Sequence, residues 1–186
     1  MPLPKTYDEY TIEDIYKLPD GQRAELIDGQ IYYMAPPSRR HQRIILSLSR
    51  QIADYIDAKN GTCEVDIAPF AVFLNEDAKT YVEPDISVIC DSDKLTDQGC
   101  KGAPDWIIEI VSPGSRRMDY SIKLFKYRSA GVREYWIVDP KRETVLCYFF
   151  EGEDYPHMYT FDDIIPVMIY DGKLEINFAD IKERLI

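Results

Sequence analysis

The chain has 186 residues, of which 45% are hydrophobic and 30% charged, and its formal net charge at pH 7 is −11. This size predicts one domain over residues 1–186, with a core from about residue 22 to 150 and a C-terminal extension from about 151 to 186. No apolar run approaches the roughly 18 residues of a membrane span, and the N-terminus lacks the apolar core of a signal peptide. We therefore expect a cytoplasmic protein with no membrane association.

Four cysteines are widely spaced, at positions 63, 90, 100 and 147, and the chain has only two histidines. No paired C-x-x-C spacing is present, which argues against a structural zinc site. Reduced thiols are the expected state in a cytoplasmic protein.

The N-terminal elements are predicted from caps and turns. A short helix at residues 11–17 is capped by Thr11 and stopped by the turn at residues 19–21. Strands at residues 24–27 and 30–34 flank Asp28-Gly29, the strongest hairpin signal of the sequence. Glu25 lies in the first of these strands, where it is either an exposed residue or a carboxylate of a functional site.

A long helix is predicted at residues 39–59, capped by Ser38 and marked by an apolar stripe of helical period. Residues 38–50 hold four arginines and no acid, a local excess of positive charge in an acidic chain. His41 lies in the first turn. A histidine there can donate to a phosphate or to an acidic site residue, or it can be a simple capping or surface group.

Three further strands are predicted at residues 63–67, 70–74 and 85–90. Asp85 opens the third strand, where its carboxylate either lies at a cleft edge or caps a turn. Residues 91–102 are polar and rich in turn formers, and we expect them to form a mobile connection.

Residues 106–111 read as a buried strand, yet Glu109 stands in the middle of it. A lone ionised carboxylate there would cost several kcal/mol, so that a cationic side chain or a metal ion must compensate it.

The four residues after this strand start a helix that runs from about residue 116 to Gly131. Asp119 and Lys123 share one side of it. An apolar face is expected to pack on the sheet, with Lys123 at its edge and able to point toward Glu109. That face is formed by Met118, Ile122, Phe125 and Ser129.

A strand at residues 134–138 is expected to pair in parallel with the strand of Glu109. A further strand is predicted at residues 143–150. Aromatic and apolar pieces follow at residues 157–161 and 166–170, then a turn at 171–173 and a terminal helix at 178–185. No chemistry is evident in this tail, which completes the fold or an oligomer contact.

Five short strings carry a family resemblance. In chain order they are residues 25–29 (ELIDG), 36–38 (PPS), 84–86 (PDI), 108–110 (IEI) followed by Ser112-Pro113, and 133–140 (REYWIVDP). The chain thereby resembles the PD-(D/E)XK nuclease superfamily and is similar to the Uma-two family of restriction-endonuclease-like proteins. The resemblance implies an α/β fold with a restriction-endonuclease-like core, in which helices flank a mixed β-sheet after an N-terminal helix and β-hairpin.

The resemblance also implies a catalytic set. Asp85 and Glu109 would bind the metal together with the backbone carbonyl of Ile110, and Glu25 would be a third carboxylate. The superfamily places a lysine two positions after the second acid, where this chain has Val111. Lys123 on the following helix is the matching residue.

The implied activity is that of a Mg²⁺-dependent endonuclease that cleaves DNA, with Mn²⁺ as a substitute ion and a homodimer to cut both strands. Residues expected to bind the substrate are His41, Arg39, Arg40, Arg116 and Arg117. One alternative is a catalytically inactive binding or assembly module, which the acidic net charge and Val111 favour. Another is hydrolysis of a different phosphate ester.

Overall fold

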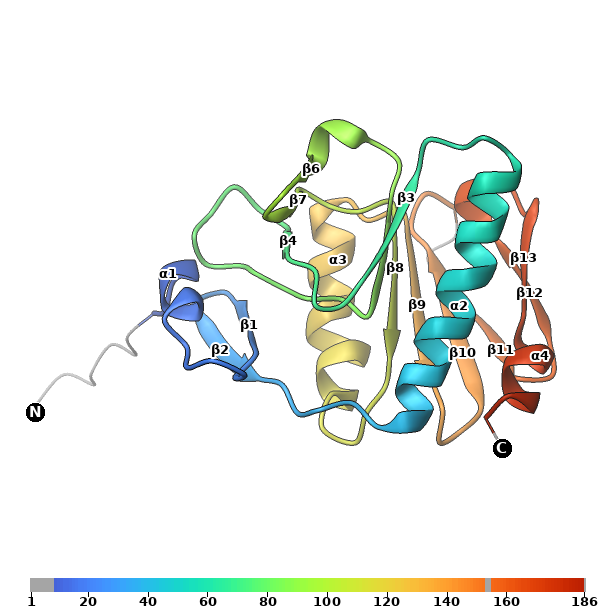
Figure 1. Ribbon diagram of the computed structural model, residues 1–186, viewed down its shortest axis with the longest axis horizontal. Helices are drawn as coiled ribbons and strands as arrows, with labels where there is room; N and C mark the ends of the chain where they lie inside the picture. Colours follow the sequence, from blue (N-terminus) through green and yellow to red (C-terminus); the bar gives the residue numbers. More distant parts are fainter. Residues whose placement is uncertain (1–8, 153–154, 186) are drawn as a thin grey trace, which may run out of the picture.

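The computed structural model describes residues 9–152 and 155–185. Its centre is a six-stranded sheet with the strand order β11-β10-β9-β8-β5-β3 (Figure 1). The pair β8 and β9 is parallel, and the other neighbouring pairs are antiparallel. The strands are β3 (Glu64–Ile67), β5 (Ile86–Ile89), β8 (Trp106–Ile110), β9 (Glu134–Asp139), β10 (Thr144–Phe149) and β11 (His157–Thr160). The predicted α/β fold with a mixed sheet is confirmed.

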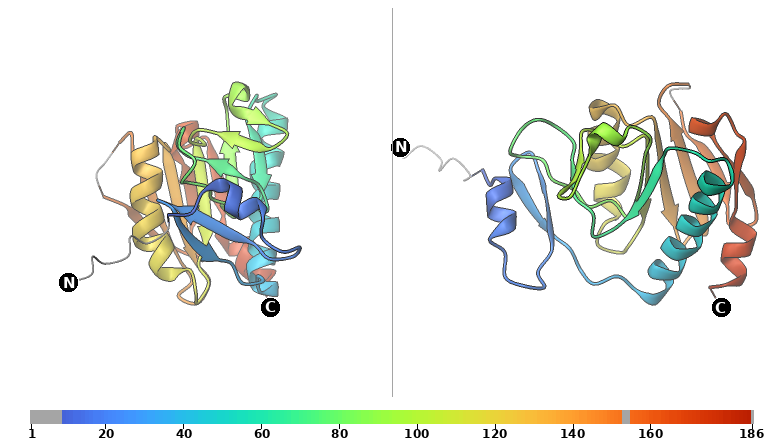
Figure 2. Two further views of the ribbon diagram at one scale, coloured as in Figure 1. Left: turned by 90° about the vertical axis from the view of Figure 1, so that its left-hand side faces the viewer. Right: turned by 45° about the horizontal axis from the view of Figure 1, so that its top comes forward.

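Helices cover both faces of this sheet (Figure 2, left). On one face lies α2 (Arg39–Ala58), whose N-cap Ser38 accepts a hydrogen bond from the backbone of His41 at 3.2 Å. Its apolar stripe packs in a core with Trp106 and Trp136. On the other face, the π-helical turn η2 (Met118–Lys123) leads into α3 (Leu124–Ala130). In the described ranges, no helix is both long and apolar enough to cross a bilayer.

The predicted apolar face of the η2–α3 helix is only partly correct. Met118 and Ile122 pack against the core, but Phe125 is 66% exposed and Ser129 is also exposed. The fully buried residues of this helix are instead Asp119, Lys123 and Tyr127. The apolar periodicity was a poor guide because ion pairs and hydrogen bonds compensate the polar side chains that face inward.

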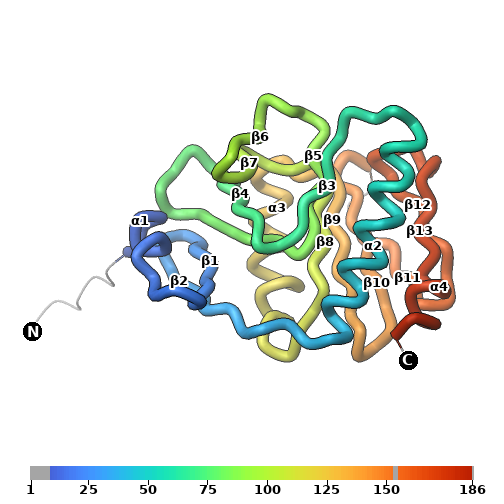
Figure 3. Tube along the Cα trace, in the orientation of Figure 1, coloured from blue at the N-terminus to red at the C-terminus, as the bar shows by residue number. Residues whose placement is uncertain are grey.

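A helix and a hairpin precede the sheet, as predicted: α1 (Ile12–Tyr16), β1 (Ala24–Ile27) and β2 (Gln30–Tyr33). Asp28 and Gly29 have φ of 51° and 75°, the left-handed pair that a tight two-residue hairpin turn requires. Figure 3 shows the hairpin at one end of the molecule, apart from the main sheet. Two backbone hydrogen bonds between Leu26 and Tyr81, at 2.7 and 2.8 Å, join it to the segment that precedes β5.

Residues 91–102, expected to form a mobile connection, contain regular elements. This segment holds a 3₁₀ turn, η1 (Ser92–Lys94), and the strands β6 (Leu95–Thr96) and β7 (Gly99–Lys101), which join β4 (Val72–Phe73) in a three-stranded sheet. The C-terminal segment also contains two strands that were not predicted. Its elements are β12 (Ile164–Val167), η3 (Met168–Tyr170), β13 (Leu174–Asn177) and α4 (Phe178–Glu183). Strands of two to four residues are too short to show a clear period.

The expectation of reduced thiols is wrong for two of the four cysteines. Cys63 and Cys90 form a disulfide, while Cys100 and Cys147 are free and buried. The reason is the antiparallel register of β3 and β5, which pairs Glu64 with Ile89 and so brings the preceding and following cysteines opposite each other.

The close packing of Gly99 predicts that the three-stranded sheet does not tolerate a side chain at this position. Its φ is +133°, and a Cβ at this position would overlap the carbonyl oxygen of Ala71. We expect Gly99→Ala to lower the free energy of unfolding by about 2 kcal/mol or more in a urea titration. Gly114→Ala is the control, since a Cβ there meets nothing within 4 Å. Equal effects of the two changes would refute this account.

Glu134 predicts a pH dependence of stability. Its carboxylate accepts hydrogen bonds from Trp136 Nε1 at 2.7 Å and from the backbone of Ile169 at 2.8 Å, and burial raises its pKa to about 7. Because the folded-state pKa lies above the ordinary 4.5, the stability from this group is complete below pH 4.5 and is lost as the pH rises to about 7. The free energy of unfolding should therefore decrease by at most about 3 kcal/mol over this pH range, and Glu134→Gln should abolish the decrease. Glu175→Gln, at an exposed position, is the control and should not change the pH dependence of the free energy of unfolding.

Candidate functional site

The centre of the site is the ammonium group of Lys123, which lies between two carboxylates. Its Nζ is 2.9 Å from Glu25 Oε2 and 2.9 Å from Glu109 Oε1. A third carboxylate, Asp119, is 4.0 Å away. Lys123 is 4% exposed and the three acids are equally buried, so that the cluster is removed from bulk water. Lys123 is therefore the cationic side chain that compensates the buried carboxylate of Glu109.

Glu25 reaches this cluster because the hairpin docks beside residues 80–83. The bridge between Leu26 and Tyr81 fixes β1, and Glu25 Oε1 then accepts a hydrogen bond from the backbone of Glu83 at 2.9 Å. Glu83 is itself held by an ion pair with Arg23 and by the Tyr81 hydroxyl at 2.6 Å. One oxygen of Glu25 thus anchors it, and the other faces Lys123.

Lys123 reaches the cluster from the π-helical turn η2. Asp119, Lys123 and Tyr127 follow one another at four-residue spacing and are all buried toward the sheet. The Tyr127 hydroxyl donates to Glu109 Oε1 at 2.6 Å, and the Ser115 hydroxyl donates to Asp119 Oδ2 at 2.6 Å. Isolated π-helical turns are rare and often occur at functional sites. Here the turn forms part of a polar helix face that is fitted to Glu109.

Asp85 and His41 form a second group next to this cluster. Continuing the antiparallel register of β5 and β8 places Asp85 opposite Glu109. Asp85 Oδ2 accepts a hydrogen bond from the backbone of Ile110 at 2.7 Å and lies 3.2 Å from His41 Nε2. His41 Nδ1 is buried and has no hydrogen-bond partner among the described residues. The first turn of α2 therefore reaches the strand end that carries Asp85.

The electrostatics of the cluster follow from burial and an excess of acid. Burial raises the pKa of Glu109 well above its usual value, although Lys123 opposes the shift. Burial also raises the pKa of Asp119 to about 6. Burial disfavours the charge of Lys123, but the charges of Glu109 and Glu25 outweigh this effect and raise its pKa. Lys123 is thus a cation, and its carboxylates hold more negative charge than it can balance.

His41 is also biased toward its charged form. Burial opposes the charge, but the hydrogen bond and charge of Asp85 raise the pKa of the imidazole. The backbone of Ile110 acts in the same direction. An imidazolium at this point adds positive charge beside Asp85.

The four arginines expected to bind substrate differ in their surroundings. Arg40 pairs with Glu143 at 3.1 Å, and Arg116 pairs with the buried Asp139. Arg39 and Arg117 are exposed and form no ion pair in the part of the chain that the structure describes. These two remain available to an anionic ligand.

The structure thus brings together Glu25, Asp85, Glu109, Lys123 and His41, five of the residues singled out in the sequence. It adds Tyr127 and the close approach of Asp119, which sequence reasoning did not place in the site. The four-residue spacing of Asp119, Lys123 and Tyr127 was a usable signal, because it puts a donor and an acceptor on the same helix side as the lysine.

The described residues contain no group of three His, Cys, Asp or Glu side chains arranged to hold a metal ion. The available donors are the carboxylates of Asp85 and Glu109 and the backbone carbonyl of Ile110. These are oxygen donors, which Mg²⁺ and Mn²⁺ prefer. Mg²⁺ commonly uses only one or two protein carboxylates and completes its shell with water and substrate phosphate. The donor chemistry therefore fits a hard divalent cation.

Removal of the central cation should be costly. Lys123→Met leaves Glu25 and Glu109 buried without their partner, and we expect a loss of about 3–5 kcal/mol in unfolding free energy at pH 8. Lys126→Met is the control, because Lys126 pairs with the exposed Asp28 and should contribute less than about 1 kcal/mol. Guanidinium titrations of both variants provide the measurement. Similar losses in the two would argue against a central role for Lys123.

Known proteins resemble the chain over most of its length. Two uncharacterized proteins of Synechocystis sp. (strain ATCC 27184 / PCC 6803 / Kazusa) are 27% identical over 153 residues and 26% identical over 133 residues. The first alignment covers 82% of this chain and 78% of the relative, and the second covers 70% and 71%. Their similarity extends through most of the described fold.

A solved structure shares the fold. It is the crystal structure of a protein from Anabaena variabilis ATCC 29413 described as "a putative nuclease belonging to DUF820". The TM-score is 0.76 at 22% identity, and the superposition covers 95% of this chain and 99% of the other.

A family model matches residues 11–177, which include the hairpin, the sheet and the whole polar cluster. The model is that of Uma2, described as "Putative restriction endonuclease". The match extends over most of the chain and contains every residue of the site from Glu25 to Lys123. The chain belongs to the Uma2 family of restriction-endonuclease-like proteins.

Proposed function

We propose that the protein is a metal-dependent endonuclease that hydrolyses phosphodiester bonds of DNA. The observation that carries the proposal is the buried pair of carboxylates, Glu25 and Glu109, on either side of Lys123, with Asp85 opposite Glu109 in the continued register of β5 and β8. Such a cluster has more acid than cation. A divalent cation would supply the missing positive charge.

Asp85, Glu109 and the Ile110 carbonyl are the groups that would hold Mg²⁺ or Mn²⁺. When bound, the ion supplies positive charge against the phosphate oxygens and favours attack by water. Asp85 is suited to this task because Oδ2 is oriented by the backbone of Ile110 and by His41. Its orientation is therefore fixed by the fold and does not depend on a ligand.

Lys123 acts in this proposal as a hydrogen-bond donor and a charge, because its raised pKa keeps it protonated. Two of its three N–H groups point to Glu25 and Glu109. The third can orient the attacking water or stabilise the charge that develops on the phosphate. Tyr127 supports this role because its hydroxyl donates to the same oxygen, Glu109 Oε1, that Lys123 contacts.

His41 would contact the phosphate next to the reacting one, and Arg39 and Arg117 would contact the strand backbone. The guanidinium groups of Arg39 and Arg117 have no ion-pair partner among the described residues, and the imidazole of His41 lies beside Asp85, where the charge of that acid raises its pKa against the effect of burial. A homodimer would place two such sites on the two strands of a duplex.

A second function is favoured by one observation. Lys123 already neutralises much of the charge of Glu25 and Glu109, and Val111 occupies the position where the nuclease superfamily has its lysine. A chain with this arrangement could serve as a binding or assembly module without catalysis. The two functions differ in their response to metal and in DNA cleavage.

The test uses the isosteric variants Asp85→Asn and Glu109→Gln, which remove charge but little volume. With supercoiled plasmid and Mg²⁺ or Mn²⁺, we expect each to reduce the cleavage rate roughly 100-fold or more. Asp97→Asn, at an exposed position, should cleave like the wild type.

Calorimetric titration with Mn²⁺ in the presence of an oligonucleotide duplex complements this assay. Loss of binding in Asp85→Asn would support the metal site. Unchanged cleavage in both isosteric variants would overturn the proposed activity, and absence of both cleavage and metal binding in the wild type would favour the non-catalytic module.

A further inference from the structure

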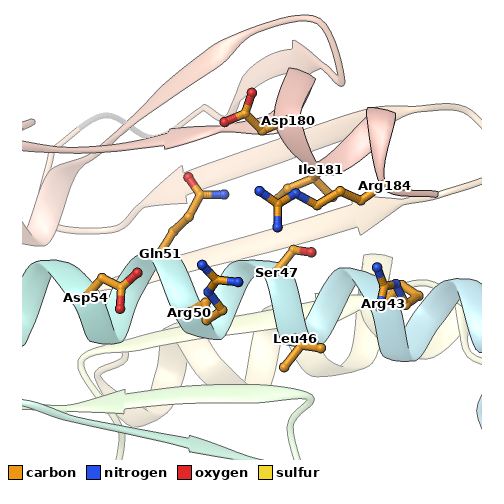
Figure 4. Close-up of a pocket in the computed structure, with 9 residues that line it drawn as sticks. All are labelled: Arg43, Leu46, Ser47, Arg50, Gln51, Asp54, Asp180, Ile181 and Arg184. Atoms are coloured by element: carbon orange, nitrogen blue, oxygen red, sulfur yellow. The ribbon is translucent and has the colours of Figure 1, made fainter.

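A pocket lies between α2 and α4, on the opposite side of the sheet from Lys123 (Figure 4). Its volume is about 140 Å³, enough to hold several water molecules. Arg43, Ser47 and Arg50 line it from α2, and Arg184, the residue that follows α4, lines it from the C-terminal segment. None of these four residues belongs to the candidate active site.

The helix spacing and a hydrogen-bonded clamp define this pocket. Arg43, Ser47 and Arg50 recur every three to four residues and so share one side of α2. Gln51 joins α2 to the residue before α4, because its Oε1 accepts from the backbone N–H of Asn177 at 2.9 Å and its Nε2 donates to the carbonyl at 3.4 Å. Ile181 is buried between the two elements. The walls of the pocket are therefore held in place by packing and by the peptide backbone.

The arginines of the pocket lack anionic partners. Among the described residues, Arg43, Arg50 and Arg184 form no ion pair, and the buried Nε of Arg43 has no hydrogen-bond acceptor. The net charge of the chain is −11, so that acidic partners are abundant, and Arg23, Arg40 and Arg116 are each paired with one. Three guanidinium groups without ion-pair partners among the described residues thus lie around one cavity.

Two acids also line the pocket. Asp54 and Asp180 lie in its wall, but neither is within ion-pair distance of the three arginines in the described structure. Figure 4 shows the guanidinium groups of Arg50 and Arg184 directed toward the same part of the pocket as Ser47, with the Asp54 side chain at one end. The lining therefore carries a net charge of +1, with its positive part around Ser47.

We propose that this pocket binds a phosphate group through Arg50, Arg184 and Ser47, with Arg43 in the adjoining wall. Guanidinium groups match phosphate oxygens in geometry and form short, charge-assisted hydrogen bonds with them. A hydroxyl group adds a neutral donor. The phosphate comes either from a free anion or from the backbone of a nucleic-acid strand. This inference concerns binding alone and does not depend on the proposed hydrolysis.

The experiment is calorimetric titration of the full-length protein in EDTA, which excludes metal-dependent cleavage. One probe is inorganic phosphate and the other is a single-stranded oligonucleotide without terminal phosphates. The test variant is Arg50→Gln with Arg184→Gln. The control is Arg142→Gln with Lys173→Gln, which removes the same charge from two exposed positions outside the pocket.

We expect the test variant to bind at least one probe roughly tenfold more weakly than the wild type, and the control to stay within about twofold. Weakened binding of inorganic phosphate identifies a free-anion site, and a loss confined to the oligonucleotide identifies a strand contact. Asp54→Asn should strengthen binding, because it removes a negative charge from the lining.

The proposal is overturned if the wild type binds neither probe, or if the test and control variants weaken binding equally. Misfolding does not obscure these outcomes, because Arg50 and Arg184 are exposed and unpaired and their replacement should leave the melting temperature unchanged. A melting curve of each variant verifies this before titration.

Discussion

The ion cluster at Lys123 is the constraint on which the rest of the structure depends. One ammonium group joins the N-terminal hairpin through Glu25, the central strand β8 through Glu109, and its own helix through Asp119. Charges this deeply buried cost several kcal/mol each unless they are paired and hydrogen-bonded. The hairpin, the π-helical turn and the inward polar face of the helix are each arranged so that this pairing is satisfied. The cluster therefore fixes the positions of three chain segments at once.

The same cluster is electrostatically incomplete. Three carboxyl groups surround one lysine, and burial, with a smaller contribution from the neighbouring acids, raises the pKa values of Glu109 and Asp119. Such a site either takes up protons or attracts further positive charge. Asp85, opposite Glu109 and oriented by Ile110 and His41, extends the oxygen-rich surface beyond the lysine. The proposed metal-assisted phosphodiester chemistry rests on this combination of a fixed lysine and neighbouring carboxyl groups.

The distribution of arginines resolves the apparent conflict between an acidic protein and an anionic ligand. Most of the negative charge lies away from α2, and several arginines of the chain are used in ion pairs such as Arg116 with Asp139. The arginines without an ion pair among the described residues lie on α2, near the start of the η2–α3 helix and after α4. An overall charge of −11 thus coexists with local positive surfaces, because phosphate recognition depends on the few groups within hydrogen-bond distance.

The sequence by itself determined the local elements and much of the site. The Asp28-Gly29 turn, the Ser38 cap and the strand containing Glu109 follow from rules that act within a few residues, and the parallel pairing of β8 and β9 follows from the crossover rule for a strand, helix and strand. The family strings pointed to Glu25, Asp85 and Glu109 as candidates, and the helix after them pointed to Lys123. Only the tertiary structure decided that Tyr127 and not Phe125 faces the sheet, that Cys63 meets Cys90, and that Arg184 lies beside Arg50. Each of these depends on partners far apart in the chain. Periodicity describes the apolar side of a helix, but it cannot reveal that a glutamate in a distant strand will stabilise a buried lysine.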